Sequence, residues 1–213
     1  MHLGRMTGFA IGVVAAFLIG SIPTGWLLGK MRGIDLREHG SKNIGATNAL
    51  RVLGKPAGIF CFIVDAGKGL GAVLIAQTLA GPMVDPGLAG VVGAVSGILG
   101  HNFTPWLGFK GGKGIATSVG ALVALLPAIV PLLLVVWLLV FFTTRYVSLA
   151  SVAASVALPV FAILQAIWFG GLSPWLLGFA CLAGGLAVLR HKSNIQRLLA
   201  GTENRFTGKK PAA

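Results

Sequence analysis

Seven runs of apolar residues recur along the chain, separated by short polar or glycine-rich segments. A run of about 20 apolar residues can cross a bilayer as a helix, which satisfies its own backbone hydrogen bonds. The composition agrees, because 55% of the 213 residues are hydrophobic and only 10% are charged. We therefore predict an all-α integral membrane protein in which residues 1–213 form a single domain. About seven transmembrane helices are expected, at 8–29, 57–80, 87–100, 115–126, 128–144, 147–169 and 173–189.

The basic residues are segregated by loop. Almost all of the 17 lysines and arginines lie in four segments, which are 30–55, 101–113, Arg145 and the tail from Arg190. If Pro127 divides 115–144 into two short helices, all four segments fall on the same side of the membrane. Cytoplasmic loops carry the excess of Lys and Arg. We therefore expect the N-terminus outside and the C-terminus in the cytoplasm.

The same distribution explains the net charge of +12. Because the cations follow the loops and do not form a basic patch with interleaved aromatics, we expect no nucleic-acid partner. Cys61 and Cys181 lie inside apolar stretches without His or Cys neighbours at metal-ligand spacing. We expect no metal site and no disulfide.

Residues 39–55 form the first polar constellation. A helix over about 44–53, capped by Ser41 or Asn43, would place Thr47 and Arg51 one turn apart. Asn48 would lie beside them. Two interpretations stay open: an interfacial amphipathic helix, or an anion site in which Arg51 supplies a planar fork of donors.

Asp65 and Lys68 interrupt an apolar run at a spacing of three residues. Charges inside a membrane are costly, so we expect them to pair, to face the bundle interior or to line a polar cavity. A structural ion pair and a pocket wall are equally compatible with the sequence.

The stretch Phe109–Gly114, FKGGKG, directly precedes an apolar helix. Backbone N–H groups of its glycines, the helix N-terminus and two lysines would converge there, which suits phosphate. The alternative is a flexible cytoplasmic turn. It is not a Walker A loop, because Gly114 and not Ser or Thr follows Lys113.

The tail supplies the fourth constellation. If the last helix continues, Arg190, Asn194 and Arg197 lie on one face, with His191 beside Asn194. A basic tail attracted to anionic lipid is one interpretation. In another, His191 hydrogen-bonds a phosphate or carries a proton.

These motifs, in this order, resemble the bacterial integral-membrane glycerol-3-phosphate acyltransferases that use acyl phosphate as donor. The resemblance runs through Gly20-Ser21-Ile22-Pro23-Thr24, Ser41 to Asn48 with Arg51, Asp65-x-x-Lys68-Gly69, Gly100-His101-Asn102-Phe103, Phe109 to Gly114, and His191-x-x-Asn194-Ile195-x-Arg197-Leu198 with Gly201 and Glu203. It implies transfer of a fatty acyl group from acyl phosphate to the first hydroxyl of glycerol 3-phosphate. The products would be lysophosphatidic acid and phosphate, in the first acylation step of phospholipid biosynthesis. It also implies the plasma (inner) membrane of a bacterium, contact with membrane lipids and an active site at the cytoplasmic face.

The resemblance implies roles for single residues as well. The catalytic set would be Ser41, Lys113 and His191. The substrate-binding set would be Asn43, Thr47, Asn48, Arg51, Lys110, Gly111, Gly112 and Asn194. Asp65, Lys68, His101 and Glu203 would contact these residues without touching the substrate themselves. No cofactor is implied, since acyl phosphate is already an activated mixed anhydride, and the general base is either His191 or the donor's own phosphate. The alternative function is a polytopic transporter or a lipid-binding protein for an anionic ligand.

Overall fold

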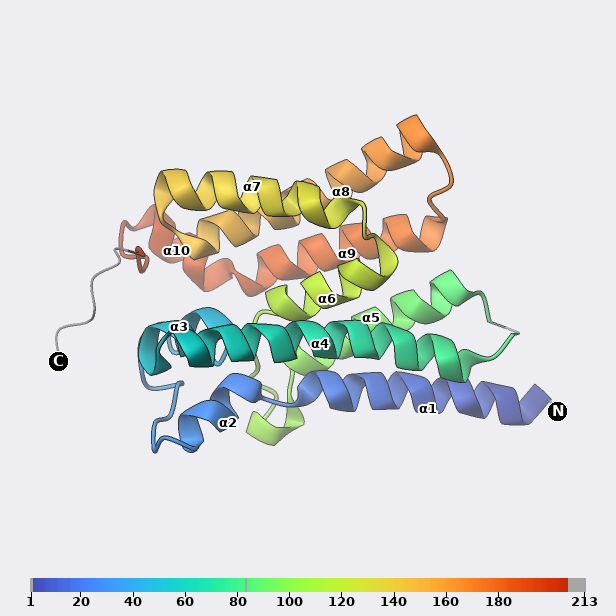
Figure 1. Ribbon diagram of the computed structural model, residues 1–213, viewed down its shortest axis with the longest axis horizontal. Coiled ribbons are helices and arrows are strands. Elements are labelled where there is room, and N and C mark those ends of the chain that lie inside the picture. Colours follow the sequence, from blue (N-terminus) through green and yellow to red (C-terminus); the bar gives the residue numbers. More distant parts are fainter. Residues whose placement is uncertain (1, 83, 207–213) are drawn as a thin grey trace.

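The computed structural model describes residues 2–82 and 84–206, and every regular element in these residues is helical (Figure 1). The predicted all-α fold is confirmed for this part of the chain. The elements are α1 (His2–Ser21), α2 (Thr24–Lys30), α3 (Ala46–Leu53), α4 (Lys55–Ala80), α5 (Pro86–Asn102), the short 3-10 helix η1 (Pro105–Leu107), α6 (Ile115–Leu125), α7 (Ile129–Thr144), α8 (Val147–Phe169), α9 (Pro174–Arg190) and α10 (Lys192–Leu199).

Each predicted apolar segment coincides with helix, and the breaks follow local chemistry. Segment 8–29 is divided into α1 and α2 at Pro23, because proline has no N–H and disfavours helix in the residue before it. The expected division of 115–144 is confirmed, since α6 ends at Leu125 and α7 starts at Ile129. Asp85 caps α5, where its Oδ1 accepts the N–H of Leu88 at 2.8 Å.

Helix α4 is the centre of one half of the bundle and packs against α1, α3, α5 and α6. Glycines on α5 allow neighbouring helices to approach it closely. Gly93 and Gly97 face Ala72 of α4, and Gly100 faces the carbonyl oxygen of Phe17 on α1. In the other half, α7, α8 and α9 pack side by side (Figure 1).

Large apolar side chains cover the outer surface of the bundle, among them Ile63, Val135, Leu139, Ile167 and Leu182. Such a surface is unfavourable in water and suits lipid. Within residues 2–82 and 84–206, three helices are long and apolar enough to cross a membrane: Thr7–Lys30, Lys55–Ala80 and Val147–Phe169. Pro174–Arg190 with Lys192–Leu199 would form a fourth across a bend of 55°. Helices α6 and α7 are shorter apolar helices.

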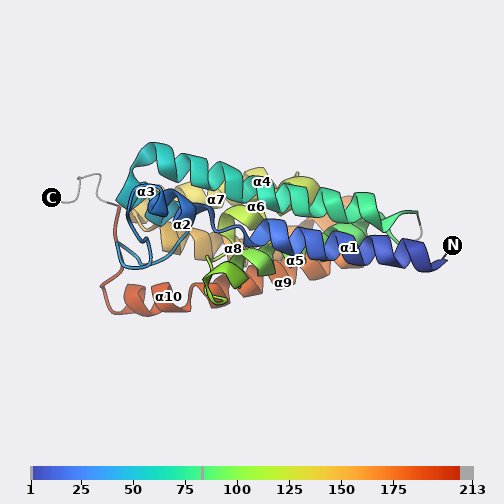
Figure 2. The same cartoon turned by 90° about the horizontal axis from the view of Figure 1, so that it is seen from below.

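Consecutive long helices run in opposite directions, and several connections lie at the two ends of the bundle, whereas those from α5 to α6 and from α6 to α7 lie between the ends (Figure 1). Helices α2, α3 and α10 and the turn between α7 and α8 lie at one end, and both views agree on this placement (Figure 2). The N-terminus and the connections from α4 to α5 and from α8 to α9 lie at the other. The basic segments 30–55 and 190–206 therefore share one end of the bundle.

Candidate active site

Helix α3 and the loop before it form the first wall of the site. The helix starts at Ala46, with Gly45 in an extended conformation as its N-cap and no side-chain cap. The helix starts close to the expected position of about 44, but the expected cap by Ser41 or Asn43 is wrong. Asn43 instead closes a turn ahead of the helix, where its Oδ1 accepts the N–H of Gly45 at 2.9 Å.

Asn48 organises this loop from inside. Its side chain is buried, its Oδ1 accepts the N–H of Ser41 at 2.8 Å, and its Nδ2 lies 2.8–3.1 Å from the carbonyl oxygens of Leu36, His39 and Asn43. These four contacts occupy both polar ends of the amide. Asn48 was expected to bind substrate directly, but its polar atoms are engaged by backbone that sequence spacing does not reveal. It shapes the loop that carries Ser41 and Asn43.

The glycine loop 110–114 folds back on the end of α5. The N–H of Gly111 donates to the carbonyl oxygen of Asn102 at 3.1 Å, and the N–H of Gly112 donates to that of His101 at 3.0 Å. The expectation that both N–H groups face a phosphate is therefore wrong. Glycine is required at 112 because a Cβ there would overlap the His101 ring. It is favoured at Gly114, which enters α6 with a φ of 81°.

Arg190 holds the same loop from the opposite side. One of its guanidinium nitrogens lies 2.8 Å from the carbonyl oxygen of Gly112 and 3.2–3.3 Å from those of Asn102 and Gly111. The last apolar helix does not continue straight through Asn194, because α9 ends at Arg190 and α10 starts after a bend of 55°. The sequence reasoning missed this role of Arg190. Its only sequence signal is a cation at the end of an apolar helix, because its partners are backbone atoms.

Glu203 is the centre of a second set of contacts, which joins the tail to the bundle. Its Oε1 accepts hydrogen bonds from Asn194 Nδ2 at 2.7 Å and Ser148 Oγ at 2.8 Å, and its Oε2 accepts one from Arg197 Nε at 2.7 Å. Asn194 Oδ1 in turn accepts a hydrogen bond from Lys113 Nζ. The structure therefore brings together Lys113 of the glycine loop with Asn194 and Glu203 of the tail. Ser148, inside an apolar helix, gave no signal in the sequence.

Burial and the charges around Lys113 set its protonation. Burial lowers the pKa of Lys113 to about 8, Glu203 raises it, and the cations Arg197, Arg190 and Arg51 lower it. Arg51 on α3 thus acts electrostatically on the same point as the tail. Burial raises the pKa of Glu203, but the hydrogen bonds from Asn194, Ser148 and Arg197 outweigh it and keep this pKa below its usual value. At neutral pH the site holds more positive than negative charge.

His191 lies at the bend, after the apolar helix has ended. Its Nδ1 is 2.7 Å from the carbonyl oxygen of Ala187, which can only accept, so Nδ1 carries the proton. Burial and the Lys113 ammonium lower the pKa of His191 to about 4. The ring is therefore neutral at pH 7 with a lone pair on Nε2. That atom can accept a hydrogen bond from a hydroxyl group.

Several predicted ligands present unused donors. In the described part of the chain, the hydroxyls of Ser41 and Thr47, the Arg51 guanidinium and the Lys110 ammonium have no hydrogen bond or ion pair to another side chain or to backbone. Lys110 is exposed, whereas the other three are half-buried. Unpaired donors at half-buried positions are costly unless an acceptor meets them. This set, with Lys113 and His191, suits phosphate oxygens and a hydroxyl group.

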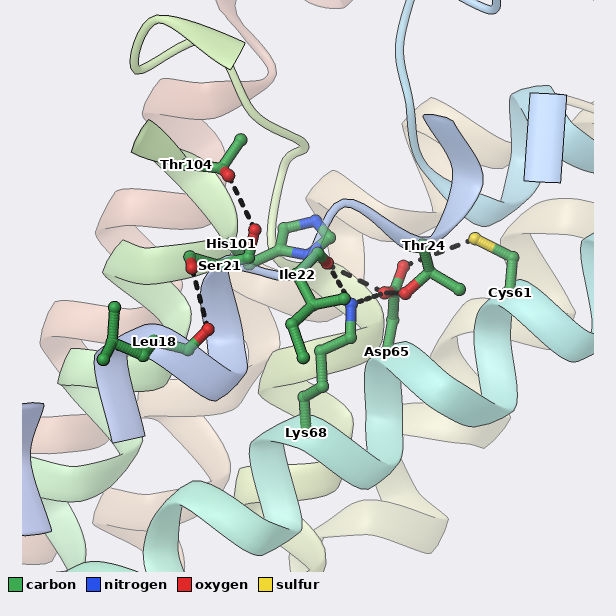
Figure 3. A network of polar contacts seen from close by, with 9 residues as sticks. All are labelled: Leu18, Ser21, Ile22, Thr24, Cys61, Asp65, Lys68, His101 and Thr104. Atoms are coloured by element: carbon green, nitrogen blue, oxygen red, sulfur yellow. Dashed lines mark hydrogen bonds and ion pairs between the residues drawn. The ribbon is translucent and has the colours of Figure 1, made fainter. Parts of the chain in front are cut away.

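Asp65, Lys68 and His101 lie apart from this cluster. They form a buried network between α4, α5 and the break before α2 (Figure 3). The expected pairing of Asp65 with Lys68 is confirmed, with Lys68 Nζ at 2.5 Å from Asp65 Oδ1.

The bundle, its apolar exterior and its cation-rich end define a helical membrane protein with a cluster of polar and basic side chains. Residues 10–201 match the family model described as glycerol-3-phosphate acyltransferase. The chain belongs to this family. It is 46% identical over 209 residues to a glycerol-3-phosphate acyltransferase of Thermosynechococcus vestitus, covering 94% of this chain and 97% of the relative. It is 42% identical over 191 residues to that of Geobacter sulfurreducens, covering 90% and 94%.

Solved structures resemble the whole bundle. One is a crystal structure of PlsY (YgiH), an integral membrane glycerol 3-phosphate acyltransferase, in its glycerol 3-phosphate form. Its TM-score is 0.83 at 37% identity, covering 93% of this chain and 95% of that chain. The same protein in its lysophosphatidic acid form has a TM-score of 0.81 at 35% identity, covering 95% and 97%. The family assignment favours the acyltransferase over the transporter considered from sequence.

Proposed function

We propose that the protein transfers a fatty acyl group from acyl phosphate to the first hydroxyl of glycerol 3-phosphate. The products are lysophosphatidic acid and inorganic phosphate, in the first acylation step of phospholipid biosynthesis. Family membership supports the acceptor, as does a structural neighbour with a glycerol 3-phosphate form and a lysophosphatidic acid form. The observation that carries the proposal is the meeting of Lys113 with Asn194, 81 residues further along the chain, in the electrostatic range of Arg51.

The binding roles follow from which donors are unused. Arg51 offers a planar fork to one phosphate, and Lys113 offers a point charge. The hydroxyls of Ser41 and Thr47 add neutral hydrogen bonds, with the Asn43 amide beside them. His191 completes the acceptor site, and Asn194, whose amide is held by Lys113 and Glu203, positions the Lys113 ammonium beside it. Exposed Lys110 attracts the anionic substrates at the rim of the site. Gly111 and Gly112, like Asn48, contribute by shaping the walls.

The reaction needs orientation and charge neutralisation more than a protein nucleophile. The acceptor hydroxyl attacks the acyl carbonyl carbon, a C–O ester bond forms, and the bond between that carbon and the phosphate oxygen breaks. The leaving phosphate takes the electron pair of the broken bond. Cations at the phosphates stabilise the charge that develops there. Holding the two substrates in line supplies much of the remaining acceleration.

The proton of the acceptor hydroxyl passes, in this proposal, to the departing phosphate. A His191 with a pKa of about 4 is a weak base at neutral pH. Its Nε2 lone pair instead accepts a hydrogen bond from the hydroxyl and aims the attacking oxygen at the carbonyl. Catalysis is therefore assisted by the substrate, with His191 in an orienting role.

The proposal places the site at the cytoplasmic face of a bacterial inner membrane. Seven apolar helices, α1 with α2 and then α4 to α9, would cross the bilayer. The N-terminus lies at the opposite end of the bundle from α3 and α10 (Figure 1). With the basic residues gathered at the end of α3 and α10, this supports a cytoplasmic position for α3 and α10 and an N-terminus outside. There the donor can keep its tail among the lipids while its phosphate meets a water-soluble acceptor.

Purified protein in lipid vesicles tests the function directly. With acyl phosphate and glycerol 3-phosphate we expect lysophosphatidic acid and phosphate to appear in equal amounts. Lys113→Ala should abolish both, whereas Lys55→Ala, which removes an exposed lysine at the start of α4, should leave both unchanged. Absence of product with acyl phosphate, or equal activity with acyl-CoA, would overturn the donor assignment.

A further inference from the structure

Two charged residues are buried below the site and take no part in the mechanism described above. Asp65 is 2% exposed and Lys68 is 5% exposed, and their side chains pair at 2.5 Å. A buried ion pair is a weak source of stability, because desolvation offsets the attraction. Its presence inside a membrane helix therefore needs another explanation.

One arm of the network reaches the first wall of the site. Lys68 Nζ donates to the carbonyl oxygen of Ile22 at 2.5 Å, which lies at the break between α1 and α2 (Figure 3). Thr24, the first residue of α2, donates its hydroxyl to Asp65 Oδ1 at 2.9 Å. The next residue, Gly25, packs so closely on the carbonyl of Ile44 that a Cβ would overlap it. The network thus supports the backbone beside Asn43.

The other arm reaches the glycine loop. His101 Nδ1 lies 3.9 Å from Asp65 Oδ1, so the carboxylate faces the imidazole (Figure 3). The His101 ring packs against Gly112, and the His101 carbonyl accepts the N–H of Gly112 at 3.0 Å. Gly112 directly precedes Lys113. Asp65 is therefore connected to the first wall through the start of α2 and to the glycine loop through His101.

We propose that Asp65, Lys68 and His101 are positioning residues. They hold the glycine loop, and with it Lys113, against the first wall of the site, which is α3 and the loop before it. The proposal rests on the proposed function for its kinetic consequence. His101 packs against one side of the loop at Gly112. Asp65 in turn holds both His101 and Thr24 at the start of α2. Arg190 holds the loop carbonyls from the other side, so loss of His101 releases one side of the loop and leaves it attached.

The test measures the pKa of Lys113, because this pKa depends on how deeply the side chain is buried. Burial is the largest cause that lowers the pKa of Lys113 to about 8, and the charges that act on it are Glu203, Arg197, Arg190 and Arg51. Lys113 in turn lowers the pKa of His191. None of these groups is changed in His101→Ala. If the loop is released, Lys113 becomes more exposed and its pKa rises towards the ordinary value of 10.5.

Two measurements are needed, and only one of them uses activity. The lysines are labelled as ¹³C-dimethyl amines, the Lys113 resonance is assigned by its loss in Lys113→Arg, and its pKa is followed by NMR in wild type, His101→Ala and Asp65→Asn. On unmodified protein of the same variants, kcat/KM for glycerol 3-phosphate is measured. We expect a higher Lys113 pKa and a fall of about 10- to 100-fold in kcat/KM for both variants, since small misplacements have effects of this size.

Phe179→Leu is the matched control. It removes core packing at a fully buried residue of α9 that lies outside the network. It should lower thermal stability without moving the Lys113 pKa. An unchanged Lys113 pKa in Asp65→Asn, which keeps the shape of the side chain, would overturn the proposal even if His101→Ala did not fold. An equal change in Phe179→Leu would overturn it as well. A wild type without transferase activity but with the expected pKa changes would reject the proposed function and retain the positioning role.

Discussion

The activity of the transferase should fall at alkaline pH because Lys113 loses its proton. This fall should begin well below the pKa of an ordinary lysine. Its ammonium is half-buried, donates to Asn194 and has a pKa lowered by burial to about 8. Lys113 can neutralise a phosphate only while it is protonated. The structural reason for the limit is therefore the burial of this one cation beside three arginines.

The size of the effect follows from the titration. At pH 9, a lysine with a pKa of about 8 is protonated in roughly one molecule in eleven, so kcat/KM should fall about tenfold from its neutral plateau. A lysine at its ordinary pKa of 10.5 would lose almost nothing at the same pH. His191, at about 4, and Glu203, below its usual value, do not change charge between pH 7 and 9.

The assay follows lysophosphatidic acid, because acyl phosphate also hydrolyses spontaneously in alkali. The ratio kcat/KM is the appropriate quantity, since it reports the pKa values of the free enzyme, before a bound phosphate raises that of Lys113. Lys113→Arg is the control, as its guanidinium stays charged throughout this range. We expect a lower plateau without the alkaline fall. A wild-type profile that is flat to pH 9.5, or the same fall in Lys113→Arg, would show that deprotonation of Lys113 does not limit activity at alkaline pH.

Three further changes test other parts of the account. His191→Gln should slow a single turnover by less than about tenfold if the donor phosphate takes the proton, whereas a general base contributes about 100-fold or more; a larger loss with glycerol 3-phosphate binding intact would make His191 the base. Asn48→Ala should lower the free energy of unfolding by about 2–4 kcal/mol, because about three hydrogen bonds, two from the N–H groups of Nδ2 and one to Oδ1, are lost at about 0.5–1.5 kcal/mol each; an unchanged thermal midpoint would contradict its shaping role. Glu203→Gln removes the carboxylate that raises the pKa of Lys113, so the alkaline fall should begin at lower pH, and an unmoved profile would count against their coupling.

The helices could be predicted from sequence because their signals are local. Apolar length identified α1 with α2 and α4 to α9, and prolines at 23 and 127 mark two of the breaks. The bend between α9 and α10 was not predicted, since His191 and its neighbours contain no helix-breaking residue. Its cause is tertiary: Arg190 contacts the glycine loop on one side of the bend, and Asn194 contacts Lys113 and Glu203 on the other.

The residue types of the site could also be predicted, but their partners could not. Arg51, Lys113 and His191 were singled out because cations and a histidine recur at the polar ends of apolar segments. Asn48 and Gly112 were expected to face substrate, yet their polar groups are used by backbone atoms. Such pairings depend on which carbonyl a fold brings near, and spacing along the chain does not specify that.

Equilibrium binding of radiolabelled glycerol 3-phosphate tests most directly whether the separated segments form one phosphate site. Wild-type protein in lipid should bind it saturably, and Lys55→Ala should bind it equally well. Arg51→Ala and Lys113→Ala should each bind at least about tenfold more weakly, which corresponds to the loss of one charge-assisted hydrogen bond. Wild-type affinity in both variants, with the proteins folded and inserted, would contradict the account.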